Sequence, residues 1–344
     1  GHASQTFEKM RAGYLVPFDV KDFGEKVRIT KQNIEQLLTA SIPRYVEAER
    51  KRLGHVDMTS NLVISMPVLI QTLHSPPFQP GGRGNNRALS KAIDSLRKEL
   101  SSPEGIQAFL IRQGIRTQGI TIAHIDIAST NRPVRNIVRS ISRFLNRFTN
   151  RHRENQKATK ILTQHLQDRL TQTPNEPGLK MAQAALTAFR SRSRDPEGAA
   201  LEQIIANKVG IRMGSCVSGK DREEMVTEMA LAITEFYAKH GEIPPPANCK
   251  TEEDRRLRQE FVQSVAKHFL SGHGQELAAA NATGCDGLKN VADVFGKGIC
   301  GAIREMAHRR GIEVDPIAAT QSIAGINKIK GSMQAKWWQR LLGI

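Results

Sequence analysis

Residues 209–222 have the sequence Val209-Gly210-Ile211-Arg212-Met213-Gly214-Ser215-Cys216-Val217-Ser218-Gly219-Lys220-Asp221-Arg222. This order predicts a strand, then a turn of small residues, then a helix. The helix continues downstream, where Met225, Met229 and Ile233 recur at helical spacing. Cys216 is therefore expected in the turn between a strand and the first residues of a helix.

Cys216 and Arg222 have the Cys-x5-Arg spacing of cysteine-dependent phosphatases. Five residues can close a loop whose backbone N–H groups point inward and, with the helix N-terminus, bind a phosphate dianion. The same field favours the thiolate of Cys216, which can attack phosphorus and form a phosphocysteine. Arg222 would grip two equatorial oxygens as a planar fork, and Gly219 would allow loop angles closed to other residues.

The chain contains a second pair with this spacing, Cys249 and Arg255. The segment between them follows three prolines, contains no glycine and carries three acidic residues, which would repel phosphate. We interpret it as a chance match at the start of a helix. For Cys216, the alternative to a nucleophile is a buried structural cysteine, because free cysteine is often buried.

The composition favours a folded chain with an anionic partner. The 344 residues include 50 Lys and Arg against 34 Asp and Glu, which gives a formal net charge of +16. This excess indicates nucleic acid, a lipid surface or a phosphorylated metabolite as the partner. Hydrophobic residues make up 39% of the chain, which excludes wholesale disorder.

Other classes of protein are disfavoured by what the sequence lacks. Four cysteines without a CxxC pair argue against a disulfide scaffold and for a reducing compartment. No apolar run approaches the ~18 residues of a membrane span. The ten histidines form no cluster at metal-binding spacing, and no nucleotide-binding fingerprint is present. We therefore expect neither a metal nor a cofactor.

Apolar periodicity predicts most of the remaining elements. β-Branched and apolar residues indicate strands over 61–73, broken by Pro67, and over 118–128. Proline and glycine between Ser75 and Asn86 predict a long loop. Helices are expected over residues 28–53, 89–101, 156–170, 178–191, 199–207 and 251–270.

Two further segments combine cations with apolar residues. Residues 132–153 carry an arginine at every fourth position from Arg135 to Arg151, which predicts an amphipathic helix with a cationic face. That face is either a solvated surface stripe or a platform for the phosphates of lipid or nucleic acid. Near the C-terminus, Trp337 and Trp338 lie among cations, which suits a membrane interface or a terminal helix docked on the body.

The loop from Cys216 to Arg222 closely resembles the CKSGKDR signature of bacterial effector inositide phosphatases, the SopB-like and SidP/SidF-like proteins injected into host cells. Eukaryotic inositol polyphosphate 4-phosphatases carry a similar loop. Residues 281–289 resemble the Asn/Thr-Gly-x-x-Gly-x-Lys element of the same effectors, and residues 67–73 and 131–136 resemble upstream segments of the family. Of these likenesses, the Cys216 loop is the highly specific one.

The resemblance implies an α/β fold with a cysteine-phosphatase-like central sheet, many surrounding helices and a helix-rich chain overall. It implies hydrolysis of phosphate from an inositol ring, with Cys216 as nucleophile and Arg222 as the clamp on the transition state. Asp221 would be the general acid or, alternatively, an acid that favours the helix dipole. Lys289 would reach the pocket or lie exposed in its loop. The other substrate-binding residues implied are Val217, Ser218, Gly219 and Lys220.

Two departures from the family pattern bear on activity. Val217 replaces the first variable lysine of the family loop, which favours a less highly phosphorylated head group. Glu223-Glu224 replaces Thr-Gly after the arginine. An ionised Glu223 cannot donate the hydrogen bond by which a hydroxyl assists the thiolate leaving group. We therefore expect an effect on turnover and none on loop geometry.

The chain is expected to form a single catalytic unit over residues 5–344. The parts expected within it are a helical N-terminal segment (5–56), a phosphatase core (57–330), a basic helical insertion in that core (130–208) and a basic Trp-containing tail (328–344).

The resemblance also implies a secreted bacterial effector that acts in virulence and lipid metabolism. Its expected location is the host cytosol, peripheral on host membranes, because the basic segments suit an anionic membrane surface. A phosphoinositide or inositol phosphate is the expected substrate. Nucleic acid is not expected, because aromatic residues are only 5% of the chain and no reader motif is present.

The leading hypothesis is a phosphoinositide phosphatase. The D3 phosphate is favoured because SidP/SidF-like relatives act there, whereas SopB-like ones act on D4. One alternative is a soluble inositol polyphosphate phosphatase. Another is a protein phosphatase, although Ser215 stands where the tyrosine-phosphatase loop has histidine. The third is a non-catalytic phosphoinositide-binding protein, which Val217 and Glu223 leave open.

Overall fold

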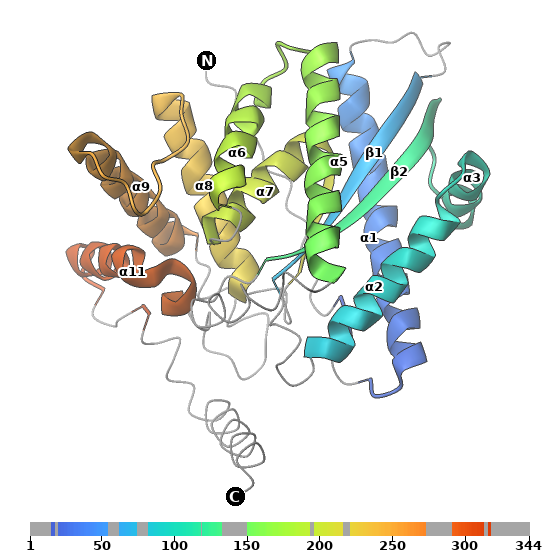
Figure 1. The fold of residues 1–344 in the computed structure, drawn as a ribbon, viewed down its shortest axis with the longest axis horizontal. Helices are drawn as coiled ribbons and strands as arrows, with labels where there is room; N and C mark the ends of the chain where they lie inside the picture. The colour runs from blue at the N-terminus through green and yellow to red at the C-terminus, as the bar shows by residue number, and fades with distance from the viewer. Residues whose placement is uncertain are drawn as a thin grey trace, which may run out of the picture. The chain divides into compact units, whose positions relative to one another are not determined.

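The computed structural model describes residues 15–17, 20–53, 62–73, 82–117, 119–132, 150–192, 196–215, 221–272, 291–312 and 316–317. The chain divides into two compact units, residues 1–219 and residues 220–344. In the first unit, the elements are α1 (Phe23–Arg52), β1 (Leu62–Thr72), α2 (Gly82–Glu99), α3 (Pro103–Arg112), β2 (Ile120–Asn131), α5 (Asn150–Gln172), α6 (Leu179–Arg192), α7 (Pro196–Val209) and β3 (Ile211–Ser215) (Figure 1).

The three strands form one parallel sheet in the order β2-β1-β3. Parallel neighbours need a crossover, and helices supply it between β1 and β2 and again between β2 and β3. β1 is predicted to break at Pro67, and this prediction is wrong, because the strand runs from Leu62 to Thr72. The proline is tolerated because β3 pairs with β1 only from Val68 onward, beyond the missing N–H.

Gly210 precedes β3 and approaches β1 closely. A Cβ atom on Gly210 would lie 2.2 Å from the backbone oxygen of Pro67 and 2.5 Å from its Cγ. We expect Gly210→Ala to lower the free energy of unfolding by ~1–3 kcal/mol, because the two backbones must separate. Gly84→Ala is the matched control, since nothing lies within 4 Å of its Cβ position, and it should raise the same quantity by ~0.5–1 kcal/mol. Urea unfolding followed by circular dichroism measures both, and equal stability of the two variants would contradict the close packing.

The sheet is covered on both faces by helices of the first unit (Figure 1). Alternate residues of β1, such as Val68 and Ile70, face a core built with α1, α2 and α3. The intervening residues, such as Leu69 and Gln71, face the side covered by α5 and α7. The largest fully buried side chains of the first core include Ile34, Leu38, Ile42, Ile93, Leu96 and Phe109. Both faces are therefore buried, as parallel sheets require.

The second unit contains α8 (Asp221–His240), α9 (Glu252–Ser271) and α11 (Val291–Arg309). α9 packs against α8 and against α11, where the rings of Phe269 and Phe295 meet edge to face at 5.7 Å. Gly296 has φ 75° inside α11 and kinks that helix, a conformation that glycine adopts without strain.

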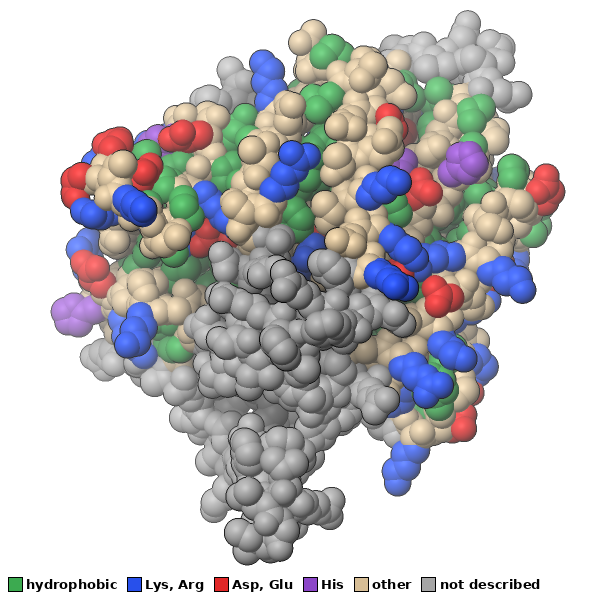
Figure 2. Space-filling view, viewed as in Figure 1, with side chains coloured by type: hydrophobic (Ala, Val, Ile, Leu, Met, Phe, Trp, Pro, Cys, Tyr) green, Lys and Arg blue, Asp and Glu red, His purple; other side chains and the backbone are tan. Residues whose placement is uncertain are grey.

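Positive charge is spread over the described surface. On the face shown in Figure 2, lysine and arginine side chains alternate with acidic ones over the described elements. Most of the basic segment 132–153 and the whole tail 328–344 lie outside the described residues, since these exclude residues 133–149 and 318–344.

Most predicted elements are confirmed in type and position. The loop predicted from Ser75 to Asn86 is wrong at its end, because α2 begins at Gly82. Two tertiary contacts account for this start: Lys26 donates to Asn85 Oδ1 at 3.2 Å, and Asn131 donates to Asn86 Oδ1 at 3.1 Å. The helices α3 and α11 are not predicted. Within the predicted helix 132–153, the structure describes Arg132 and then α5 from Asn150.

Candidate functional site

The candidate site begins at the carboxyl edge of the sheet. Thr72 pairs with Asn131 on one side and with Ser215 on the other, so the three strands end at the same level. Cys216 follows Ser215 directly. Ligands of open parallel sheets bind outside the carboxyl ends of the strands. The predicted strand and helix are confirmed, since β3 ends at Ser215 and α8 begins at Asp221.

The predicted loop residues Cys216, Val217, Ser218, Gly219 and Lys220 lie outside the described residues, as does Lys289. Their contacts with one another therefore stay a prediction.

Two described residues open the helix after the loop. Asp221 is the first residue of α8, and Arg222 is the second, with a partly buried side chain. Glu223, the departure from the family pattern, is completely buried, and its backbone oxygen accepts a hydrogen bond from Thr227 Oγ1 at 2.9 Å.

A buried carboxylate on α7 holds the ends of β1 and β2. Glu202 is completely inaccessible to solvent. Its Oε2 accepts hydrogen bonds from Gln71 Nε2 at 2.7 Å and Thr130 Oγ1 at 2.8 Å. Its Oε1 accepts one from Arg132 Nη2 at 2.6 Å. Both oxygens of Glu202 are thus engaged by the next-to-last residues of β1 and β2 and by the residue after β2.

Gln71 extends this network to β3. Its amide nitrogen also donates to the backbone oxygen of Ala199 at 2.9 Å, and its amide oxygen accepts from Arg212 Nε at 2.9 Å. Arg212 lies in β3, four residues before Cys216. One side chain therefore links α7, the central strand and the strand that carries the candidate nucleophile.

Arg132 closes the network at the other edge strand. Its backbone N–H donates to Thr72 at 2.9 Å, and its guanidinium lies over the ring of Phe189 at 4.9 Å. Thr72 Oγ1 in turn donates to the backbone oxygen of Thr130 at 2.9 Å. Because Glu202 is fully paired with a cation and neutral donors, it suits a positioning role and not proton transfer.

The sequence analysis does not single out Glu202, Gln71, Thr130 or Arg212. A signal is nevertheless present, because Glu202 is an acid in a helix that is buried along most of its length. Polar residues also end β1 and β2, whose Gln71-Thr72 and Thr130-Asn131 follow several buried apolar residues. Buried polar residues at strand ends are typical of ligand-binding edges in α/β folds.

The second Cys-x5-Arg match lies at a helix start, as predicted. Thr251 caps α9 by accepting from the N–H of Asp254 at 3.1 Å, and three acids occupy the first turn. Arg255 is held by Glu252 at 2.8 Å and by the backbone oxygen of Lys250 at 2.9 Å. The guanidinium of Arg255 is thus engaged by residues at the start of its own helix, and this contact leaves no phosphate cradle with Cys249.

The described residues contain neither a metal-binding cluster nor a membrane-spanning helix. No group of three or more His, Cys, Asp and Glu side chains there could hold a metal ion. Of the helices described, none combines the length and the apolar character needed to span a bilayer.

Comparisons with known proteins agree with this fold. No protein-family model matches the chain. No curated protein matches it. Among solved structures, the chain is similar to a crystal structure of a Legionella phosphoinositide phosphatase, described for its bearing on lipid metabolism in pathogen–host interaction. The TM-score is 0.54 at 19% sequence identity, over 91% of this chain and 35% of that one.

The fold class is confirmed. The chain has a helix-rich α/β fold around a small parallel sheet, similar to that of an inositide phosphatase. It spans 35% of the length of the solved structure it matches, so the activity of the whole neighbour is not transferred with the fold.

Proposed function

We propose that this chain is a phosphoinositide phosphatase that works through a phosphocysteine intermediate. The observation that carries the proposal is the position of Cys216, one residue beyond the level at which all three parallel strands end and five residues before α8. The Cys-x5-Arg spacing and the likeness to the inositide-phosphatase loop give that position its chemistry.

The proposed reaction has two steps. The thiolate of Cys216 attacks phosphorus, the bond from phosphorus to the inositol oxygen breaks, and Asp221 gives its proton to that oxygen. Water then attacks the phosphocysteine and gives a proton to the carboxylate of Asp221, the S–P bond breaks, and inorganic phosphate leaves while the thiolate of Cys216 and the protonated Asp221 are restored. Arg222 holds the equatorial oxygens in both steps and offsets their developing charge.

The other residues of the loop are assigned to binding. Backbone N–H groups from Val217 to Lys220 would bind the phosphate oxygens. The side chains of Lys220 and Lys289 would contact further phosphates of the ring. Val217 gives the pocket no charge, which favours a substrate with few phosphates; we propose the D3 phosphate of a membrane inositol lipid.

The basic segments supply the proposed membrane attachment. Residues 132–153 and the Trp-containing tail 328–344 would hold the protein at an anionic host membrane, where each nearby cation contributes on the order of 1 kcal/mol. We therefore also propose that the protein acts at host membranes, where its lipid substrate occurs.

A substrate panel tests the proposal. Phosphate release is measured from short-chain phosphoinositides, soluble inositol phosphates and phosphotyrosine peptides at equal concentration. We expect release from one or a few phosphoinositides, with D3-phosphorylated lipids ahead. Preferred release from soluble inositol phosphates would change the proposed substrate from a membrane lipid to a soluble inositol phosphate. Release from phosphopeptides alone would indicate a protein phosphatase instead.

A second candidate function is a non-catalytic phosphoinositide-binding protein. Glu223 favours it, because a buried carboxylate directly after Arg222 stands where the family has a hydroxyl. In the same panel, no release from any substrate together with retained binding to phosphoinositide vesicles would support this function.

A further inference from the structure

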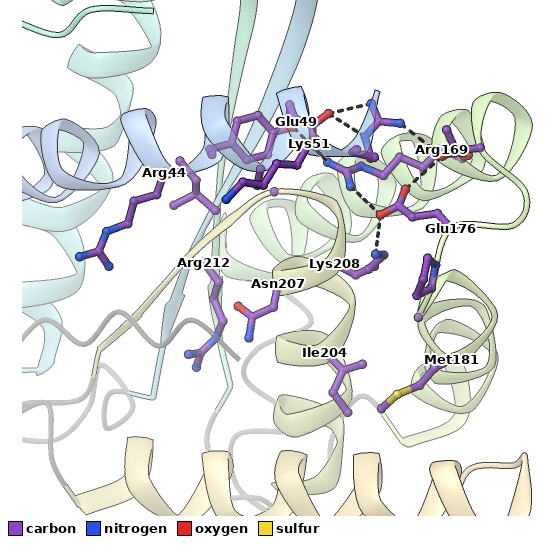
Figure 3. A pocket seen from close by; sticks show the side chains of 18 of the residues that line it. Arg44, Glu49, Lys51, Arg169, Glu176, Met181, Ile204, Asn207, Lys208 and Arg212 are labelled. Carbon is purple, nitrogen blue, oxygen red and sulfur yellow. Dashed lines mark hydrogen bonds and ion pairs between the residues drawn. The ribbon is translucent and has the colours of Figure 1, made fainter. Parts of the chain in front are cut away.

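The first unit contains a large cavity at the opposite end of β3 from the candidate nucleophile (Figure 3). Its volume is about 980 Å³. The second half of α1, the turn between α5 and α6, the end of α7 and the start of β3 enclose it. Gly210 and Ile211 line it, whereas Ser215 at the far end of β3 does not. The cavity is therefore separate from the carboxyl edge of the sheet.

Cations outnumber acids among the residues that line the cavity. Two carboxylates, Glu49 and Glu176, face six basic side chains, which is a formal excess of four positive charges. The basic side chains are Arg44, Lys51, Arg52, Arg169, Lys208 and Arg212.

The two carboxylates are already engaged by cations in the wall. Glu49 accepts from Arg52 at 2.7 Å and pairs with Arg169. Glu176 pairs with Arg169 at 3.3 Å and with Lys208. The pairs join α1, α5, α7 and the α5–α6 turn, so they fix the shape of the wall.

The tyrosine beside this cluster adds no negative charge. Arg169 donates to the hydroxyl of Tyr45 at 3.4 Å. Burial, followed by the charge of Glu49, raises the pKa of Tyr45 to about 12, so the phenol stays neutral at physiological pH. Three cations and two carboxylates in the wall leave a local excess of one positive charge.

Further cations lie toward the side of the cavity away from this cluster. Figure 3 shows Lys51 and Arg212 extending from α1 and β3 on that side, with the amide of Asn207 between them and Arg44 beyond. Arg44 and Lys51 are exposed, and the acid nearest to Lys51 is Glu47, at 3.4 Å and itself half exposed. Exposed pairs of this kind contribute little, so both cations are available to a ligand.

We propose that this cavity binds a small molecule carrying two or more phosphate groups, at a site distinct from the Cys216 loop. Its volume lies at the upper end of the range for small-molecule sites. Arginine binds phosphate oxygens as a planar fork, and lysine binds them as a point charge. Met181 and Ile204 give the lining an apolar part that suits the carbon framework of such a ligand. The proposal does not depend on the phosphatase proposal.

The test measures binding by isothermal titration calorimetry with the full chain carrying Cys216→Ser, so that no probe is consumed. The probes are inorganic tripolyphosphate, inositol hexakisphosphate and phosphatidylcholine vesicles with and without a phosphoinositide. In this background, Arg44→Glu with Lys51→Glu should weaken binding of the free polyphosphates by about tenfold or more. Lys91→Glu with Lys98→Glu on α2 is the matched control, with the same change in net charge on exposed residues outside the cavity, and should change affinity less than about twofold.

Equal weakening by both double variants would overturn the proposal, because binding would then follow net charge alone. So would loss of binding on Arg222→Ala, because the probe would then occupy the Cys216 loop. Weakened binding of the free polyphosphates with unchanged vesicle binding supports a soluble ligand. Weakened binding of both supports a lipid head group as the source of the phosphates.

Discussion

Cys216→Ser should reduce phosphate release from the best substrate by at least ~10³-fold and leave binding of that substrate within about threefold. Serine has almost the same shape as cysteine, but its hydroxyl is not ionised at neutral pH and cannot replace the thiolate as nucleophile. The proposed backbone cradle for the phosphate would be unchanged by this substitution. Single-turnover phosphate release measures the first effect, and vesicle co-sedimentation measures the second.

Cys249→Ser is the matched control for this substitution. Cys249 is a free, partly buried cysteine with the same spacing to an arginine, but Arg255 is held by its own helix start. We expect at least half of the wild-type rate. Loss of release in Cys249→Ser with retention in Cys216→Ser would refute the assignment of the nucleophile.

Glu202→Ala should lower the free energy of unfolding by ~3–5 kcal/mol, the largest stability effect we expect in the first unit. The substitution leaves the guanidinium of Arg132 buried without its carboxylate, and it removes the acceptor of Thr130 and one of the two acceptors of Gln71. Chemical denaturation followed by circular dichroism measures the change. Glu47→Ala removes a half-exposed acid on α1 and should change stability by less than ~0.5 kcal/mol.

A second variant separates the buried pair from the rest of the network. Replacing both partners, Glu202→Leu with Arg132→Met, removes the unpaired charge and should recover part of the lost stability. Recovery should be incomplete, because Thr130 still loses its acceptor and Gln71 still loses one of its two. Full stability in Glu202→Ala itself would show that the network does not hold the strand ends together.

Much of the fold can be predicted from local patterns in the sequence. Helices such as α1 and α9 follow from apolar residues at helical spacing, and β2 follows from alternating isoleucines. α3 also has a local signal in the sequence, since Ser102 caps it and Pro103 opens it. α11 is difficult to predict because it contains several glycines, which disfavour a helix, and one of them, Gly296, lies at its kink. The start of α2 depends on contacts from distant residues, which local propensity does not contain.

The candidate site also has one part that local sequence indicates and one part that depends on distant residues. The loop from Cys216 to Arg222 can be proposed from the sequence, because its chemistry depends on spacing within one short segment, and it stays a prediction. The network at the carboxyl ends of the strands is not predictable, because Gln71, Arg132, Glu202 and Arg212 come from four separate elements or their ends. Each of these residues alone fits an exposed polar position. Their function as supports becomes visible when the sheet register brings them together.

The pairing of β1 with β3 also determines when the sheet can be completed during synthesis of the chain. Thr72 pairs with Ser215, which is made about 140 residues later. One edge of β1 therefore stays unpaired while most of the first unit leaves the ribosome. Open strand edges favour association between chains, and such distant pairings slow folding. The network that joins the strand ends is complete only after β3 has been made. A nascent chain therefore has no assembled candidate site before residue 215 has emerged.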